Sequence, residues 1–210
     1  MSNSHYVNYG CGFEAFENYL NFDASPTLRF ERLPFFGKLI NKNGSRFPDL
    51  VRYGDIVKGL PIAADSCQGI YCSHILEHLS LNDFRAALIN TRVVLRPGGI
   101  FRLVLPDLEY IANQYLKNNA SDAAHDFMVQ TYLGVINRPR GIYGILSDVL
   151  GNSKHLWMWD LKSISKELCD AGFSDVRRAY FGDSQDSHFS LLENEQRWVN
   201  CLGIECRKPG

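Results

Sequence analysis

The stretch Asn8-Tyr9-Gly10-Cys11-Gly12 decides the fold of this chain. Residues 5–9 form a short run that we interpret as a buried strand, and the two glycines end it in a tight turn. Glycine lets the backbone adopt left-handed conformations and lets another molecule approach closely. A Gly-x-Gly turn is common by itself, so its meaning depends on the residues further along the chain.

Three later segments are also predicted to be buried strands, and each carries polar groups at or near its end. They are Asn18–Asp23, Leu50–Ile56, which contains Asp55, and Gly69–Ser73, which leads into His74. Because the carboxyl ends of parallel strands meet at one edge of a sheet, we expect these groups to lie beside the glycine turn and Asp107. Backbone access, a carboxylate for ribose and a partner for adenine are what a nucleoside cofactor requires.

Strand-like and helix-like segments alternate along most of the chain. A capping pattern at Ser80-Leu81-Asn82-Asp83 begins a helix, and the strand-like segment Ile100–Leu105 comes after it. We therefore predict an α/β fold with a mostly parallel central sheet and helices on both faces. Val176–Phe181 and Trp198–Cys206 have no clear helix between them, which predicts an antiparallel edge strand. Phe13–Glu17 is too short for a first crossover helix.

The composition is that of an ordinary globular chain. Its 210 residues suit one domain spanning 1–210, with 45% hydrophobic and 21% charged residues. The net charge of -1 does not favour nucleic acid as a partner, and no apolar run reaches the roughly 18 residues of a membrane span. The chain lacks a signal-peptide pattern, and its six cysteines include no CxxC pair, so we expect a cytoplasmic protein. Residues near 26–48 and 118–160 are expected to be insertions.

Several motifs together resemble class I S-adenosylmethionine-dependent methyltransferases of the methyltransferase type 11-like family. They are Asn8-Tyr9-Gly10-Cys11-Gly12, Asp23, Asp55, Ser73-His74-Ile75-Leu76-Glu77-His78-Leu79, Leu95-Arg96-Pro97-Gly98-Gly99, residues 102–107 and Ala171-Gly172-Phe173. The resemblance implies a Rossmann-like fold, a transferase that methylates an acceptor, and S-adenosylmethionine as the cofactor.

The resemblance also implies which residues contact the cofactor. Gly10 and Gly12 would let the backbone approach its methionine part, and Asp23 would accept hydrogen bonds from both ribose hydroxyls. Asp55 and the amide of Ile56 would recognise the adenine edge. The full set implied for the cofactor is Asn8, Gly10, Cys11, Gly12, Asp23, Asp55, Ile56, Ser73 and His74, the last two near the sulfonium.

Methyl transfer mainly requires alignment of the acceptor and exclusion of water, with a general base for an oxygen or nitrogen acceptor. The candidate catalytic residues are His74, His78, Asp107 and His155. Structural alternatives stay open, because His78 can pack at the start of a helix and Asp107 can cap one. The segment His155–Asp160 can either shield the sulfonium or pack over the sheet.

Other ligands fit the sequence less well. A nicotinamide dinucleotide site would place its ribose-binding acid about 20 residues beyond the glycines, whereas Asp23 comes soon after Gly12. His74 and His78 have no third ligand at metal-binding spacing, so no metal site is predicted. The chain contains no G-x-S-x-G motif of a serine hydrolase.

The sequence therefore predicts a single-domain methyltransferase. Its near-neutral charge favours a small-molecule or saccharide-like acceptor, and it leaves the oligomeric state open. Most relatives carry an acid at the position of Asn8, which would meet the methionine ammonium without a charge. That departure and the missing first helix keep an alternative from another class open, a non-catalytic S-adenosylmethionine-binding or scaffolding module with the same fold.

Overall fold

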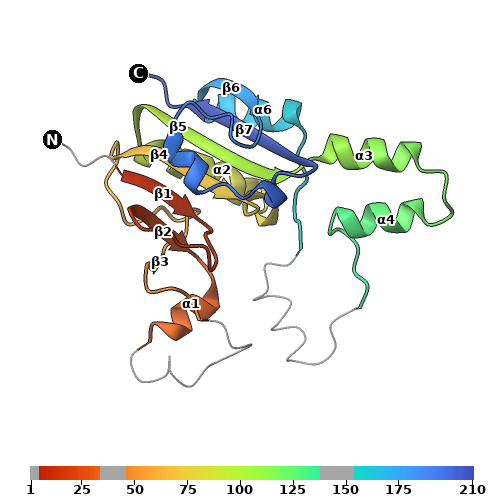
Figure 1. Ribbon diagram of the computed structural model, residues 1–210, viewed down its shortest axis with the longest axis horizontal. Coiled ribbons are helices and arrows are strands. Elements are labelled where there is room, and N and C mark those ends of the chain that lie inside the picture. The colour runs from red at the N-terminus through yellow and green to blue at the C-terminus, as the bar shows by residue number, and fades with distance from the viewer. Residues whose placement is uncertain (1–4, 34–45, 138–153) are drawn as a thin grey trace.

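Seven strands form one sheet in the order β3-β2-β1-β4-β5-β7-β6 (Figure 1). The strands are β1 (His5–Tyr9), β2 (Tyr19–Asp23), β3 (Val51–Tyr53), β4 (Cys67–Ser73), β5 (Leu95–Pro106), β6 (Ser174–Ala179) and β7 (Cys201–Arg207). This computed structural model describes residues 5–33, 46–137 and 154–210.

The sheet has the predicted mixture of strand directions. Strands β1 to β5 are parallel to one another, whereas β7 runs antiparallel to both β5 and β6. The pair β6–β7 therefore supplies the antiparallel edge that the sequence predicts. In the register, Tyr9 lies opposite both Phe22 and Cys72, so the carboxyl ends of β1, β2 and β4 meet at one edge.

Five α-helices and three short 3₁₀ helices lie among the described residues. The α-helices are α1 (Pro26–Glu31), α2 (Leu81–Val94), α3 (Leu108–Lys117), α4 (Ala123–Gln130) and α6 (Leu161–Asp170). The 3₁₀ helices are η1 (Leu76–His78), η2 (Ser187–Leu191) and η3 (Glu195–Arg197). Capping side chains fix the starts of several α-helices: for example, Ser80 accepts from the Asp83 amide, and Asp160 forms a capping box with Ser163.

Two α-helices cover one face of the sheet. Phe84 and Leu88, four residues apart on α2, are fully buried, as are Ile164 and Leu168 on α6. The four-residue spacing places each pair on one side of its helix, and both pairs pack into a single core with sheet residues such as Phe101. This core holds the strands in place, and with them the loops at the carboxyl edge.

The opposite face is covered mainly by the segment between β6 and β7, which lies in front of the sheet in Figure 1 while α2 lies behind it. Phe189 of η2 is fully buried there and Trp198 is nearly so. Helices thus lie on both faces, as predicted, and those described on this face are the short 3₁₀ helices η2 and η3. The link between β1 and β2 is too short for a crossover helix, as predicted, and it contains none.

A buried arginine anchors this second layer. The side chain of Arg102 on β5 has no exposed surface, and it pairs with Asp183, Glu193 and Glu205. It also donates to the carbonyl of Tyr180 at 2.7 Å, and its guanidinium lies 4.7 Å from the centre of the Trp198 ring. Several acceptors thus offset the cost of burying one charge.

The helices α3 and α4 form a pair that projects beyond the end of β5 (Figure 1). The rings of Tyr115 and Phe127 join the two helices, with centroids 5.4 Å apart. The predicted insertion at 118–160 thus contains α4, while residues 138–153 lie outside the described residues. The same holds for 34–45 of the insertion at 26–48, which begins with α1. No described helix is both long and apolar enough to cross a membrane.

Candidate functional site

The glycine turn and Asp23 meet directly at the carboxyl edge of the sheet. The amide of Gly12 donates to Oδ2 of Asp23 at 2.9 Å, and the amide of Ser25 donates to Oδ1 at 2.7 Å. Asp23 is 8% exposed, so its carboxylate is largely withdrawn from water. Each carboxylate oxygen has a second lone pair, which leaves capacity to accept a ribose hydroxyl.

Both glycines are required by the backbone. Gly10 and Gly12 have φ angles of 67° and 55°, in the left-handed region that glycine adopts without strain. A Cβ atom on Gly10 would lie 2.1 Å from Cγ1 of Ile75, whereas one on Gly12 would meet nothing within 4 Å. Side chains therefore pack against the turn at Gly10, whereas the space beside Gly12 is open. A turn that holds a ligand with its backbone would have this form.

Two asparagines and a cysteine hold this turn in place. Nδ2 of Asn8 donates to the carbonyl of Glu14, and Asn21 bonds both the amide and the carbonyl of Phe16. The Cys11 side chain is buried beside Leu28. Only the backbone of Cys11 is therefore placed to contact a cofactor. Burial raises the pKa of the Cys11 thiol to about 12, with a further contribution from Asp23. It stays protonated at neutral pH.

The predicted adenine-binding residues lie one strand further along. Asp55 comes just after β3, which pairs with β2 next to Asp23. Its Oδ1 accepts from the amide of Val57 at 3.0 Å, and its Oδ2 pairs with Lys58 at 2.9 Å. Ile56 is buried, and Asn90 of α2 holds its carbonyl at 2.8 Å. The structure thus brings Asp55 and Ile56 to the same edge, and contact with adenine stays a prediction.

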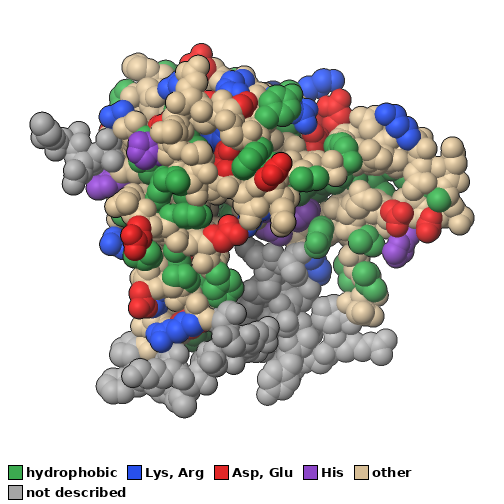
Figure 2. All heavy atoms as spheres, viewed as in Figure 1, with side chains coloured by type: hydrophobic (Ala, Val, Ile, Leu, Met, Phe, Trp, Pro, Cys, Tyr) green, Lys and Arg blue, Asp and Glu red, His purple; other side chains and the backbone are tan. Residues whose placement is uncertain are grey.

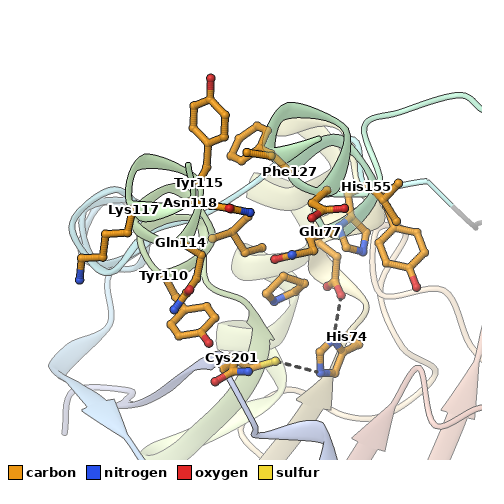
Figure 3. Close-up of a pocket in the computed structure, with 18 of the residues that line it drawn as sticks. His74, Glu77, Tyr110, Gln114, Tyr115, Lys117, Asn118, Phe127, His155 and Cys201 are labelled. Atoms are coloured by element: carbon orange, nitrogen blue, oxygen red, sulfur yellow. Dashed lines mark hydrogen bonds and ion pairs between the residues drawn. The ribbon is translucent and has the colours of Figure 1, made fainter. Parts of the chain in front are cut away.

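Ser73 ends β4 at the centre of this edge, and His74 follows it directly. Ser73 is buried, and His74 has a φ of 54°, a strained conformation for a residue with a side chain. Nε2 of His74 lies 2.9 Å from the carbonyl of Arg197, and Nδ1 lies 3.3 Å from Oε1 of Glu77 (Figure 3). Strained backbone of this kind persists where surrounding contacts determine it, and it concentrates at functional sites.

The imidazole of His74 is held in its charged form. Burial disfavours the charge, but contacts with Cys201, Glu77 and the carbonyl of Arg197 outweigh it and raise the pKa of His74 to about 10. At neutral pH both ring nitrogens therefore carry protons. This geometry suits a hydrogen-bond donor better than a base, and the catalytic role of His74 stays a prediction.

Asp107 lies at the end of β5, where its side chain is fully used. Its Oδ1 accepts from the amides of Glu109 and Tyr110, which caps α3, and its Oδ2 pairs with Arg178. The side chain is 3% exposed. Asp107 therefore acts as a helix cap, which is the structural alternative for this residue. Nothing in the geometry supports it as a base.

His78 and His155 come together although they are far apart in sequence. Their rings are 5.1 Å apart, and both lie beside the buried carboxylate of Glu77. Burial lowers the pKa of His155, so that its imidazole is neutral at neutral pH. Trp159, in contrast, stacks on Phe84 in the core. This end of the segment His155–Asp160 therefore packs over the sheet, as the structural alternative proposed.

A cavity of about 960 Å³ opens between the carboxyl edge and the α3–α4 pair (Figure 3). His74, Glu77, His78 and His155 form part of its wall. The residues of the helical pair that line it, among them Tyr110, Gln114, Asn118, Phe127 and Gln130, are not among the residues predicted for the site, and neither is Glu77. Two short helices joined by a turn carry too little periodicity to place a pocket, so the sequence holds no signal for them.

Comparisons with known proteins agree with this fold. Residues 7–103 match a family described as a methyltransferase domain. Solved structures with the same fold include an S-adenosylmethionine-dependent methyltransferase from Archaeoglobus fulgidus, with 14% identity over 99% of this chain and 87% of that one, at a TM-score of 0.51. The putative methyltransferase in complex with the Trm112 activator from Haloferax volcanii has 12% identity over 100% of this chain and 84% of that one. Its TM-score is also 0.51.

A longer relative shares the fold as well. Phosphoethanolamine N-methyltransferase 2 from Haemonchus contortus has 10% identity and a TM-score of 0.51, and this chain spans 50% of its length. No curated protein matches the sequence. The match at 7–103 shows a methyltransferase domain in this part of the chain, and the fold is the Rossmann-like fold of solved S-adenosylmethionine-dependent methyltransferases.

Proposed function

We propose that the chain transfers the methyl group of S-adenosylmethionine to a small-molecule or saccharide-like acceptor bound in the 960 Å³ cavity. One observation carries this proposal. His74 lies directly after β4 beside the glycine turn and also lines the cavity, so the predicted cofactor site and the cavity share a wall. A methyl group presented at this wall would face an acceptor in the cavity.

The lining of the cavity supports the kind of acceptor. Amide side chains at Gln114, Asn118 and Gln130 can bond hydroxyl groups, and the rings of Tyr110 and Phe127 offer flat apolar surfaces. Amides combined with rings suit a polyhydroxylated or similarly polar small molecule. The face shown in Figure 2 mixes acidic and basic side chains with no extended basic patch among its described residues, which gives no support to a long nucleic acid.

The chemistry assigns simple tasks to the chain. S-adenosylmethionine supplies an electrophilic methyl group on a sulfonium, so the protein has to bind it, align the acceptor and exclude water. Asp23 would hold the ribose, and the charged His74 would orient groups at the shared wall by donating hydrogen bonds. His78 and His155 are the predicted catalytic residues left facing the acceptor side.

Calorimetry with S-adenosylhomocysteine tests the cofactor site. We expect Asp23→Asn to weaken binding by about 1–3 kcal/mol, because one acceptor oxygen and the charge are lost at a buried position. Asp49→Asn is the matched control, since the Asp49 side chain is 95% exposed and its ion pair is with Arg32. An acceptor screen with labelled cofactor then tests transfer. Binding without transfer to any acceptor would favour the non-catalytic module, and no binding at millimolar ligand would overturn the proposal.

A further inference from the structure

Three potential metal ligands meet on the wall of the cavity. Glu77, His78 and His155 each offer one ligand atom, and these atoms lie within 4.8 Å of one another. Glu77 and His78 belong to η1, shortly after β4. The segment after His155 is tied to them, because the amides of Leu156 and Trp157 both donate to the carbonyl of Glu77, at 2.8 and 3.1 Å.

Two of the three side chains are buried with atoms left unpaired. The carboxylate of Glu77 is 1% exposed, and among the described residues its Oε2 has no hydrogen-bond partner. The charged imidazole of His74 lies 3.3 Å from Oε1 and pairs with that oxygen. His155 is 8% exposed, and its Nδ1 likewise has no hydrogen-bond partner in the described part of the chain. A buried carboxylate oxygen and a buried ring nitrogen without partners are costly, and a bound cation would use both as ligands.

The two histidines are also oriented as metal ligands usually are. Nδ1 of His78 lies 2.8 Å from the carbonyl of Lys154, so it donates its proton there and leaves Nε2 with a free lone pair toward Glu77. Nδ1 of His155 is buried and has no hydrogen-bond partner in the described part of the chain, so it is available as a ligand atom. In metal sites a carbonyl commonly holds the second ring nitrogen in this way and fixes the tautomer.

We propose that Glu77, His78 and His155 bind a divalent transition metal of the zinc type. One carboxylate and two imidazoles form a ligand set known from zinc sites that keep a fourth position open. Zinc–ligand bonds of about 2.0–2.2 Å require the side chains to draw together by roughly 1 Å from the spacing seen here. The open position would face the cavity, which all three residues line.

The use of this metal rests on the proposed function, whereas metal binding does not. A cation on the acceptor side would hold a hydroxyl oxygen of the acceptor and make its proton easier to lose to water. The oxygen would then attack the methyl carbon as the carbon–sulfur bond breaks. The balanced products are the methyl ether, neutral S-adenosylhomocysteine and one proton. This arrangement accounts for two histidines that neither cap a helix nor fill the core.

The metal content of untagged protein tests the proposal. After chelation and dialysis against zinc or cobalt, we expect one equivalent per chain, and cobalt should give visible d–d bands without a thiolate charge-transfer band. His78→Gln and His155→Gln should each lose at least about tenfold in metal affinity. His125→Gln is the matched control, because its side chain is 72% exposed on α4 outside the cluster.

Thermal melts of each variant establish that it folds, and the wild-type measurement stands even if a variant does not. Failure of the wild type to take up metal would overturn the proposal, as would full uptake by both folded variants. S-adenosylhomocysteine binding is measured on the same metal-free protein. Retained binding with no metal uptake would refute the metal site alone and leave the methyltransferase proposal intact.

Discussion

At the scale of single residues, the site depends on backbone geometry more than on charge. Gly10, Gly12 and His74 all have positive φ angles, and all three lie at the carboxyl edge of the sheet. Gly10 is fixed by packing against Ile75, whereas the space beside Gly12 is open. No described side chain would clash with a Cβ atom on Gly12. We therefore attribute the requirement for a small residue at this position to close approach of the cofactor.

Gly12→Ala tests this attribution. We expect the variant to lose about 1 kcal/mol of stability, from the strain of a left-handed alanine, and to lose most of its affinity for S-adenosylhomocysteine. Gly182→Ala is the control, because Gly182 has a φ of 72° and also has nothing within 4 Å of an added Cβ. Thermal melts and calorimetry provide the two readings. Equal ligand affinity in the two variants would show that no ligand approaches Gly12.

At the scale of elements, the second layer of the fold depends on a few polar contacts. Asp186, just before η2, accepts from the hydroxyl of Tyr6 at 2.6 Å and from the amide of His188 at 3.1 Å. Burial alone would raise the pKa of Asp186, but the hydrogen bonds from Tyr6 and from the side chain and amide of His188 outweigh it and lower the pKa. Its contribution to stability is therefore present above the ordinary carboxyl pKa near 4 and is lost as the pH falls through the lowered value.

We expect the difference in stability between wild type and Asp186→Asn to depend on pH. Wild type should be more stable than Asp186→Asn at pH 6, and the difference in the free energy of unfolding should shrink as the pH falls below about 4. Denaturant titrations at several pH values provide the measurement, with the half-exposed Asp126→Asn as a control. A difference that is constant or grows in acid would show that Asp186 is not stabilised as its carboxylate.

A substitution of Arg102, which lies on the sheet, also tests what holds this layer in place. Arg102→Met would leave the buried Glu193 and Glu205 without this cation, and we expect a loss of about 3–5 kcal/mol in the free energy of unfolding. Arg85→Met removes a pair between exposed Arg85 and Glu167, so it should cost no more than about 1 kcal/mol. Denaturant melts compare the two variants. Similar small losses in both would mean that Arg102 does not anchor the segment between β6 and β7.

At the scale of the whole molecule, the sequence predicts the features that local patterns encode. The glycine turn, the acids at the ends of β2 and β3, and the antiparallel β6–β7 pair are all predictable, because turn residues and strand ends are signals within a few positions. The cavity is not. Its wall joins η1 to α3, α4 and His155, and contacts across such separations leave no periodic trace.

The same limit explains two further differences. Arg102 lies in the run Ile100–Leu105, which has the pattern of a buried apolar strand, and its acidic partners come from residues 183–205. Sequence spacing near His74 and His78 reveals no third metal ligand, whereas the residue that approaches Glu77 and His78 in the structure is His155. Residues that are distant in sequence and close in space can be paired only once the sheet order is known.

The central claim is that S-adenosylmethionine binds at the carboxyl edge of this sheet. A crystal structure of the protein grown with S-adenosylhomocysteine tests it most directly. We predict density for the nucleoside next to Gly10–Gly12, with the ribose hydroxyls on Asp23, the adenine beside Asp55 and Ile56, and the sulfur near His74. Density for the ligand at another place, or an empty edge at millimolar ligand, would contradict the account.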